Sequence, residues 1–314
     1  MKIAVTGCAG FIGANFSEYI LDNYPSDSIV GIDCLTYAAS KEALLGLSER
    51  KNFVFYKADI CDKAEIDRIF DIERSTVVVN FAAESHVDRS LIDPEIFMRT
   101  NYHGVRVLLE SSLRYGVKHF HQISTDEVYG DKPIDSLDRF TELSELNPTS
   151  PYSESKAKAD MLVLDFSEKQ GISASISRST NNYGKYQHTE KLIPMAMNSI
   201  LSDTPVPIYG DGSNMRDWLY VMDHCRAVDM IIRAGERGIF NVGAGNEWAN
   251  IDLVKKIMSL LGKPDSEIAF VEDRKNHDKR YPICCDKIKN VLGWTPEAEF
   301  EIKLKETVDW YKNK

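Results

Sequence analysis

The hydrophobic positions in the first half of the chain form short apolar runs that alternate with longer amphipathic stretches. Runs typical of buried strands lie at residues 2–6, 28–33, 53–57, 76–80 and 119–124. Between and after them, apolar residues recur at helical spacing and predict helices at 41–47, 64–70, 94–115 and 151–167. This repeated strand-helix order predicts an α/β protein with a doubly wound parallel sheet, the Rossmann fold, which binds ligands at the carboxyl ends of its strands.

A glycine-rich turn, Gly7-Cys-Ala-Gly-Phe-Ile-Gly13, follows the first strand directly. Gly7 allows a tight turn, Gly10 lets a diphosphate approach the backbone, and Gly13 lets the next helix pack closely on the strand. The free N–H groups and the positive end of that helix then face an anion, so the start of the helix, including Phe11 and Ile12, is expected at the diphosphate. The turn therefore predicts a dinucleotide-binding site.

Later strand ends carry further residues expected around this dinucleotide. Asp33 ends the second strand at the right distance for a carboxylate that binds the adenine ribose, and it would repel a 2′-phosphate, which favours NAD over NADP. Asp59 and Ile60 lie where the adenine ring would rest. The small side chains of Ala82 and Ala83 permit close passage of the cofactor, with simple tight packing as the alternative interpretation.

Composition and charge narrow the class of protein. The chain has 314 residues, of which 43% are hydrophobic and 27% charged, as suits one large or two modest globular domains. A formal net charge of −10 argues against nucleic acid as a general partner. The six cysteines show no metal-ligand spacing. Because the N-terminus enters a strand directly and no apolar run is long enough to span a membrane, a cytoplasmic protein without a membrane partner is expected.

Residues able to perform chemistry follow the fifth strand and begin a later helix. Thr125, Asp126 and Glu127 are consecutive at a strand's carboxyl end. Adjacent acids in a loop are most often a solvated surface, but this position favours a site. Tyr152 and Lys156 are four residues apart on one helical face, where the ammonium would lower the pKa of the phenol towards that of a usable base. Because Tyr152 and Lys156 follow a predicted dinucleotide-binding turn in the sequence, the pair indicates hydride transfer from or to an alcohol.

Other motifs accompany the glycine turn, the Thr-Asp-Glu triplet and the Tyr-Lys pair along nearly the whole chain. They lie at residues 35–37, 82–90, 179–184, 190–194, 208–212, 216–218, 245–252 and 273–278. With them the chain resembles the extended short-chain dehydrogenases/reductases, and closely the dTDP-glucose 4,6-dehydratases among these. The triplet discriminates, because sugar-nucleotide epimerases of this superfamily typically lack the adjacent Asp-Glu and the decarboxylases usually carry Ser before the Glu.

The resemblance implies NAD-dependent dehydration of a nucleoside-diphosphate glucose, with dTDP-glucose favoured. Tyr152, assisted by Lys156 and Thr125, would take the proton of the C4 hydroxyl while hydride passes to NAD. The resulting 4-ketone acidifies H5, which Glu127 would remove while a protonated Asp126 donates to the departing C6 oxygen. Hydride return to C6 then gives the 4-keto-6-deoxy sugar nucleotide and water. NAD is regenerated in each turnover and is expected to stay tightly bound.

The resemblance also assigns binding residues and no metal. The NAD-binding residues that it adds are Leu35, Thr36, Phe81, Ser85, Thr100, Tyr152, Lys156 and Asn182. The substrate-binding residues are Ser85, Thr125, Asn181, Lys191, Leu192, Pro207, Ile208, Tyr209, Arg216, Asn250, Asp273, Arg274 and His277. His86, His119 and His121 are interpreted as packing or loop residues, since no further ligand lies at a metal-binding spacing.

Two domains and a homodimer are expected. Residues 1–180 are predicted to form the NAD-binding domain, and residues 181–314 a smaller C-terminal α/β domain that binds the nucleotide sugar, with parts of about 215–250 returning to the first domain. The homodimer is expected by analogy with the family. Lys275-Asn276 replaces the family's usual Pro-Gly, which leaves the preference for base and sugar open.

Alternatives from three classes stay open at this point. The first is a dehydratase of a UDP-, GDP- or CDP-sugar. The second keeps the fold and changes the reaction to that of a sugar-nucleotide 4-epimerase or decarboxylase, for which Asp126 and Glu127 would be incidental. The third is an NAD-binding sensor without turnover. The intact set of five catalytic residues argues against the sensor.

Overall fold

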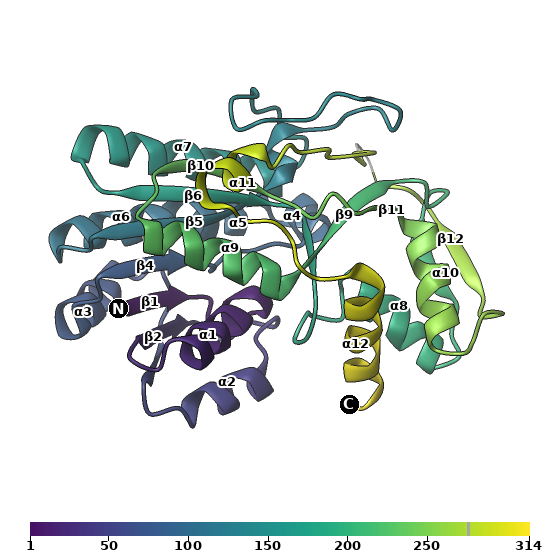
Figure 1. Cartoon of the computed structure of the whole chain (residues 1–314), viewed down its shortest axis with the longest axis horizontal. Coiled ribbons are helices and arrows are strands. Elements are labelled where there is room, and N and C mark those ends of the chain that lie inside the picture. Colours follow the sequence, from purple (N-terminus) through teal and green to yellow (C-terminus); the bar gives the residue numbers. More distant parts are fainter. Residues whose placement is uncertain (275–276) are drawn as a thin grey trace.

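A twisted parallel sheet with helices on both faces forms the larger part of the molecule, and a smaller lobe lies at one end (Figure 1). The computed structural model describes residues 1–274 and 277–314. The seven strands of the large sheet are ordered β10-β6-β5-β4-β1-β2-β3 and pair in parallel. The order reverses between β1 and β4, which places a ligand cleft at the carboxyl ends of these strands. The predicted doubly wound fold is confirmed.

The strands of the large sheet agree closely with the predicted runs. They are β1 (Lys2–Thr6), β2 (Ser28–Asp33), β3 (Phe53–Lys57), β4 (Val77–Asn80), β5 (His119–Thr125), β6 (Ala174–Ser179) and β10 (Gly238–Val242). Every residue of β4, β5 and β6 is buried, because helices cover both faces of the sheet, whereas the edge strand β3 has no fully buried residue.

Two sets of helices cover the two faces of the large sheet. One face packs against α1 (Phe11–Asn23), α2 (Lys41–Ser48) and α9 (Val221–Ala234). The other packs against α3 (Lys63–Glu73), α6 (Val105–Arg114) and α7 (Pro151–Gln170). Successive strand residues serve opposite faces: Ile3 and Val5 contact the first set, and Ala4 contacts the second.

The helix expected over residues 94–115 is interrupted. The structure has α5 (Pro94–Met98), a π-helical segment (Arg99–Gly104) and then α6, with a further short helix, α4 (Val87–Ile92), before them. Gly104 lies against Ile60 so closely that a Cβ atom there would be 2.5 Å from the Ile60 Cδ1 atom. Segments of this kind are frequent at functional sites, and Thr100 within it lines the cleft described below.

The smaller lobe is built from short strands and three helices (Figure 1). Its sheets are β11 (Glu247–Ala249), β9 (Met215–Tyr220) and β7 (Asn181–Tyr183), and the parallel pair β12 (Ile268–Val271) and β8 (Val206–Tyr209). They share a core with α8 (Leu192–Leu201), α10 (Asn250–Leu260) and α12 (Phe300–Lys312). Helix α11 (Asp286–Leu292) instead packs with β10, where Ile288 and Trp294 contact Phe240 and Val242.

Gly13→Ala is expected to lower the free energy of unfolding by about 1–3 kcal/mol or more, as overpacking of a tight contact does. A Cβ atom on Gly13 would lie 2.2 Å from the carbonyl oxygen of Gly7, and backbone atoms cannot turn away as a flexible side chain can. The matched control is Gly46→Ala in α2, where a Cβ atom meets nothing within 4 Å. That change should stabilise by about 0.5–1 kcal/mol. Urea denaturation followed by circular dichroism measures both, and equal effects would contradict the expectation.

Candidate active site

A cleft follows the carboxyl edge of the large sheet and has two adjoining parts that share Gly7, Gly10, Ala38, Phe81 and Ala83. Predicted residues that line the part towards the smaller lobe are Phe11, Ile12, Gly13, Ser85, Thr125, Asp126, Glu127, Tyr152, Lys156, Asn181, Asn182 and Lys191. Those that line the part towards β2 and β3 are Asp33, Thr36, Asp59, Ile60, Ala82 and Thr100. The fold thus brings most of the predicted cofactor residues and all the predicted catalytic residues into one cleft.

The part of the cleft beside β2 is organised around Asp33. Its carboxylate accepts hydrogen bonds from the backbone N–H of Ala9 at 3.0 Å and of Leu35 at 2.7 Å. Burial raises the pKa of Asp33, and these two hydrogen bonds oppose the increase. On the far wall, Arg99 Nη2 donates to Asp59 Oδ2 at 2.6 Å. The carboxylates of Asp33 and Asp59 therefore line this part of the cleft, where hydroxyl groups of a ligand could donate hydrogen bonds to them.

The N-terminus of α1 opens onto the middle of the cleft. Gly10 is its N-cap residue, and no side chain caps the free N–H groups of the first turn. Gly7 adopts φ +68°, and a Cβ atom there would lie 2.7 Å from the backbone nitrogen of Ala82. The turn therefore requires glycine at this position, and the helix presents unpaired N–H groups and its positive dipole end, as suits a diphosphate.

The acidic pair lies at the end of β5, where the strand turns into a short 3₁₀ helix (Asp126–Tyr129). Thr125 Oγ1 donates to Asp126 Oδ1 at 3.2 Å and accepts from the backbone N–H of Glu127 at 3.3 Å. Burial raises the pKa of Asp126 well above its ordinary value, and the charge of Glu127 adds to the increase. Burial also raises the pKa of Glu127, but Arg216 and then Lys191 oppose it. The pKa of Asp126 is thus raised more strongly than that of Glu127, so Glu127 is the acid that ionises more readily.

Helix α7 presents Tyr152, Lys156 and Asp160 on one face, each one turn after the last. Lys156 Nζ donates to the backbone oxygen of Ile123 at 2.5 Å, which ties the helix to β5. Burial lowers the pKa of Lys156 to about 8, and Asp160 opposes the decrease. Asp160 in turn accepts from Arg178 Nε at 2.9 Å in a buried ion pair. Helix α7 thus places the phenol of Tyr152 and the ammonium of Lys156 in the same part of the cleft as Asp126 and Glu127.

The phenol of Tyr152 does not have the lowered pKa that the sequence suggests. Burial raises its pKa, the charge of Glu127 raises it further, and a hydrogen bond with Thr125 opposes both. Lys156 is not among the groups that shift this pKa, and its ammonium donates to the backbone oxygen of Ile123. A positive charge close to the phenol oxygen is therefore needed before Tyr152 can act as a base.

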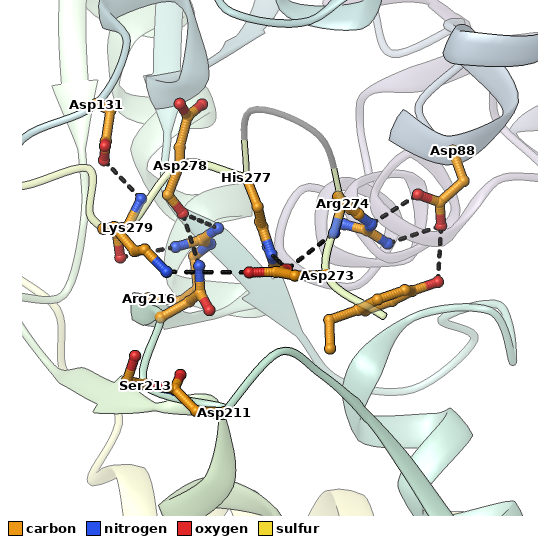
Figure 2. Close-up of polar contacts among 12 residues, drawn as sticks. Asp88, Asp131, Asp211, Ser213, Arg216, Asp273, Arg274, His277, Asp278 and Lys279 are labelled. Carbon is orange, nitrogen blue, oxygen red and sulfur yellow. Dashed lines mark hydrogen bonds and ion pairs between the residues drawn. The ribbon is translucent and has the colours of Figure 1, made fainter. Parts of the chain in front are cut away.

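Arg216 and the segment 277–279, called here the wall of the smaller lobe, lie side by side (Figure 2), although neither is among the residues that line the two parts of the cleft. The Arg216 guanidinium donates to the backbone oxygens of Met215, Lys279 and Asp278 at 2.7, 3.2 and 2.9 Å. Its carbon also lies 4.6 Å from the centre of the Tyr281 ring. Asp131 of the larger lobe accepts from the Lys279 N–H at 2.6 Å, so this wall is fixed to both lobes.

Arg274 bridges the two lobes (Figure 2). Its Nε atom lies 2.6 Å from Asp88 Oδ1, and its Nη2 atom donates to Asp88 Oδ2 at 2.8 Å. Tyr209 supports the pair: its hydroxyl donates to Asp88 at 3.2 Å, and its ring lies under the guanidinium at 4.4 Å. His277 Nδ1 contacts Asp273 Oδ1 at 2.5 Å. Lys275-Asn276, which departs from the family pattern, lies outside the described residues.

Some predicted binding residues are not among those that line the two parts of the cleft. Five of them, described above, are Tyr209, Arg216, Asp273, Arg274 and His277, and the other five are Leu35, Leu192, Pro207, Ile208 and Asn250. Leu35 contributes its N–H to Asp33 and exposes its side chain, and Leu192 and Ile208 pack into the core of the smaller lobe. The Ile208 side chain is 2% exposed, so the predicted substrate contact of Ile208 would have to come from its backbone. Pro207 is half-buried in β8. Asn250 begins α10, and its Oδ1 atom is buried without a hydrogen-bond partner in the described part of the chain.

Several residues that line the cleft were not predicted as site residues. They are Ser179, Thr180, Gln187, His188 and Glu190 in one part, and Cys34, Ala58, Glu84 and Arg99 in the other. The motifs that carried the family resemblance include Ser179, Thr180 and Glu190, so these three residues could have been predicted from the resemblance. Gln187 and His188 lie in an irregular segment after β7, where no periodicity marks a side chain as facing a cleft.

Residues 1–274 and 277–314 contain neither a metal-ligand group nor a helix that could span a membrane. Within these ranges, no three or more His, Cys, Asp or Glu side chains are grouped as metal ligands. None of the helices described combines the length and apolarity of a membrane span. His86 lies 3.8 Å from Glu190, and His119 and His121 are buried in the large sheet.

Comparisons with known proteins place the chain in a family. Residues 4–307 match the family model described as GDP-mannose 4,6 dehydratase. The chain is 45% identical over 312 residues to the low-salt glycan biosynthesis protein Agl12 of Haloferax volcanii, with 99% of this chain and 98% of that protein covered. It is 43% identical over 335 residues to dTDP-glucose 4,6-dehydratase 1 of Escherichia coli, with 99% and 92% covered.

A solved structure gives the same assignment. DesIV, a dTDP-glucose 4,6-dehydratase from Streptomyces venezuelae solved with NAD bound, has a TM-score of 0.95 and 38% sequence identity, with 100% of this chain and 97% of that chain covered. The resemblance predicted from the glycine turn, the acidic pair and the Tyr-Lys pair is confirmed. The chain belongs to the GDP-mannose 4,6 dehydratase family of extended short-chain dehydrogenases/reductases and is a relative of the dTDP-glucose 4,6-dehydratases.

Proposed function

We propose that this protein is an NAD-dependent hydro-lyase that converts dTDP-glucose to the 4-keto-6-deoxy sugar nucleotide and water. The observation that carries the proposal is the meeting of Asp126 and Glu127 with Tyr152 in the cleft. Of the protein's own groups, oxidation at C4 by NAD needs only a base such as the phenol, whereas elimination across C5 and C6 needs a further base and an acid. The names of the relatives from Escherichia coli and Streptomyces venezuelae support the same reaction.

The residues of the cleft fit NAD. Gly7 and Gly10 leave room for the diphosphate beside the uncapped start of α1, and the Asp33 carboxylate is fixed by two backbone N–H groups where ribose hydroxyls can donate to it. Asp59, Ile60 and Thr100 line the same end of the cleft. When bound, NAD supplies the oxidant that takes hydride from C4 of the sugar and later returns it to C6. The acid at the end of β2 favours NAD over NADP.

Tyr152 and Thr125 would handle the proton of the C4 hydroxyl. The phenolate of Tyr152 accepts that proton. The Thr125 hydroxyl, which donates to Asp126 in the structure, would stabilise the phenolate by turning its hydrogen to it, in line with its lowering effect on the pKa of Tyr152. Lys156, with a pKa of about 8, is mostly protonated at neutral pH and lies one helical turn from the phenol. Its ammonium donates to the backbone oxygen of Ile123, so it would stabilise the buried phenolate only after turning towards the phenol oxygen.

Glu127 and Asp126 would divide the elimination between them. The 4-ketone acidifies H5, and Glu127 removes that proton as a general base, since Arg216 and Lys191 favour its ionised form. Asp126 is fully buried beside Glu127, and this environment favours its protonated form. It can therefore donate a proton to the departing C6 oxygen. The pKa of Asp126 is raised more than that of Glu127, and a difference in this direction is what the two roles require.

Cations at the wall of the smaller lobe would bind the substrate diphosphate. Lys191 Nζ donates to the backbone oxygen of Ser85 at 2.8 Å, and Arg216, Lys191 and Arg274 all act on Glu127 by lowering its pKa. Together they concentrate positive charge in a protein whose formal net charge is −10. Asn181 and Asn250 add polar contacts, the latter with an unpartnered buried oxygen among the described atoms.

The homodimer stays a prediction that exposed apolar side chains support. Leu91 and Ile92 on α4, Ile96 on α5 and Met161 on α7 are 51%, 84%, 39% and 63% exposed. These helices pack against one another, so the four side chains lie on neighbouring elements. Such a cluster is typical of a surface that another chain covers.

Proton NMR of the purified protein, mixed separately with dTDP-, UDP-, GDP- and CDP-glucose and without added cofactor, tests the proposal. We expect a new C6 methyl doublet, fastest with dTDP-glucose, which would demonstrate both dehydration and retained NAD. A faster reaction with another nucleotide would change the base assignment. If no methyl signal forms even after NAD is added, the dehydratase assignment fails, and the 4-epimerase and the decarboxylase become the leading candidates.

A further inference from the structure

A buried row of polar side chains crosses the face of the large sheet that α9 covers. His119 and His121 lie on alternate positions of β5, and Ser175 and Ser177 lie on alternate positions of the neighbouring β6. Their side chains therefore share one face of the sheet, whereas Phe120 and the other intervening residues pack into the apolar core of the opposite face. Histidines and serines are rarely so completely buried without a specific role for their hydrogen bonds.

Seven hydrogen bonds join this row end to end. They link Arg237 Nε to Ser173 Oγ at 3.2 Å, Ser173 Oγ to His119 Nδ1 at 3.0 Å, His119 Nε2 to Ser175 Oγ at 2.7 Å, Ser175 Oγ to His121 Nδ1 at 2.7 Å, His121 Nε2 to Ser177 Oγ at 3.1 Å, Ser177 Oγ to His224 Nε2 at 3.5 Å, and His224 Nδ1 to Asn182 Oδ1 at 3.0 Å. The row runs from the exposed Arg237, just before β10, to Asn182 in the cleft.

The two ends of the row set the direction of every hydrogen bond between them. The guanidinium of Arg237 can only donate, and an amide oxygen can only accept. The amide atom of Asn182 that faces His224 is Oδ1, because Nδ2 donates to the Thr180 backbone oxygen at 2.9 Å. A hydroxyl has one hydrogen and a neutral imidazole has one N–H, so each member accepts from one neighbour and donates to the next. His224 must then carry its hydrogen on Nδ1, and His119 and His121 must carry theirs on Nε2.

The environment keeps these imidazoles neutral, as this scheme requires. Burial lowers the pKa of His119 to about 4, and the charge of Arg237 contributes to the decrease. Burial lowers the pKa of His224 to about 3 and that of His121 well below its ordinary value. At neutral pH each ring therefore holds a single N–H.

Asn182 connects the row to the active site. Its Nδ2 donates to the backbone oxygen of Thr180 and, at 3.3 Å, to Ser179 Oγ, so the side chain closes the turn between β6 and β7. Ser179, Thr180 and Asn181 of this turn line the cleft. Ser179 also pairs in register with the catalytic Thr125 on β5. The amide of Asn182 is thereby committed to holding the turn, and its oxygen depends on a donor at His224.

We propose that His224 is a positioning residue for the turn Ser179–Asn182, held in its Nδ1–H tautomer by the hydrogen-bonded row through Ser177, His121, Ser175, His119 and Ser173. The row is a static support and no proton path, because a guanidinium ends it on one side and an amide on the other, and neither relays a proton. The effect on turnover rests on the proposed function, whereas the tautomer assignment is independent of it.

Nitrogen-15 NMR of the histidine-labelled protein at neutral pH tests the tautomers directly, with His119, His121 and His224 assigned from single variants. We expect the His224 ring to be protonated on Nδ1 and the other two on Nε2, all neutral down to about pH 5. A His224 ring protonated on Nε2, or on both nitrogens at neutral pH, would overturn the direction of the row. Because the readout needs no substrate, it stands even if the dehydratase assignment fails.

Turnover of His224→Leu and His224→Asn tests the positioning role. Leu and Asn have nearly the same shape, and only Asn can donate from a position close to that of Nδ1. We expect the Leu variant to lose about 10-fold to 100-fold in kcat/KM for dTDP-glucose, as when a buried acceptor is left without its donor. The Asn variant should recover most of that loss. Equal losses in two variants that are equally folded by circular dichroism would refute the proposal.

A serine pair keeps the test decisive if the Leu variant fails to fold. Ser177→Ala leaves His224 Nε2 without its donor, while His224 Nδ1–H can still donate to Asn182 Oδ1, so we expect kcat/KM to fall and the fraction of the Nδ1–H tautomer in the NMR spectrum to decrease. Ser112→Ala is the matched control, since Ser112 is fully buried on α6 and its hydroxyl has no partner in the described residues. Identical kinetics and an unchanged His224 tautomer in Ser177→Ala would show that the row does not support the turn.

Discussion

Glu127→Gln should lower kcat for dehydration of dTDP-glucose by about 10²-fold to 10⁴-fold, the usual contribution of a general base. Glutamine keeps the shape of the side chain but cannot accept H5 once C4 is oxidised. Thr125 and Tyr152 remain in place, so oxidation at C4 should continue. Stopped-flow absorbance after mixing with dTDP-glucose should therefore show NADH that forms and then persists, while the methyl signal of the product stays absent.

Glu168→Gln provides the control for this change. It makes the same substitution at an exposed position of α7, far along the helix from the cleft residues, and should leave both signals unchanged. Normal turnover of Glu127→Gln would refute its role as the base. Loss of NADH formation as well would assign Glu127 to binding or oxidation and leave the elimination without its proposed base.

Tyr152→Phe should abolish both steps, with kcat lowered by about 10²-fold to 10⁴-fold and no NADH formed. Only the phenol oxygen is removed. The ring packs edge-on against Phe97 at 6.3 Å between centroids and is 9% exposed, so phenylalanine can occupy the same space and the fold should be retained. The measurement is the same stopped-flow trace combined with product NMR.

The two variants together separate oxidation from elimination. If Tyr152→Phe still forms NADH, the phenol is not the base for the C4 hydroxyl. Tyr102→Phe on the π-helical segment is the matched control, because its hydroxyl contacts Arg106 at 2.8 Å and not a catalytic residue. That control should have unchanged turnover and unchanged binding of NAD.

The catalytic cleft was predictable because its parts are encoded in short stretches of sequence. The glycines of the turn from Gly7 to Gly13 favour its backbone geometry by themselves. Asp126 and Glu127 are consecutive residues, so they are neighbours in any fold of the chain. Tyr152 and Lys156 lie on one helical face through the helical repeat alone. Parallel strands then bring these stretches to one edge, since all their carboxyl ends point the same way.

Other features needed contacts between residues far apart in the chain. The π-helical segment forms where Gly104 meets Ile60, and Ile208 faces the core because α8 and α10 lie on that side of β8. The raised pKa of Tyr152 depends on burial and on the charge of Glu127, and neither follows from a spacing of four residues. Periodicity reports which face a residue occupies but not which element covers that face.

The sequence by itself therefore determined the doubly wound sheet and the glycine turn, and it predicted the candidate catalytic groups, because each rests on local backbone geometry or on neighbours in the chain. The alternation of His119, His121, Ser175 and Ser177 was also visible, but it carried no meaning without a partner. Only the tertiary structure placed His224 of α9 between Ser177 and Asn182 and so gave the row a direction. Hydrogen-bond direction and pKa depend on what surrounds a group in three dimensions, and these properties emerge when the chain is folded.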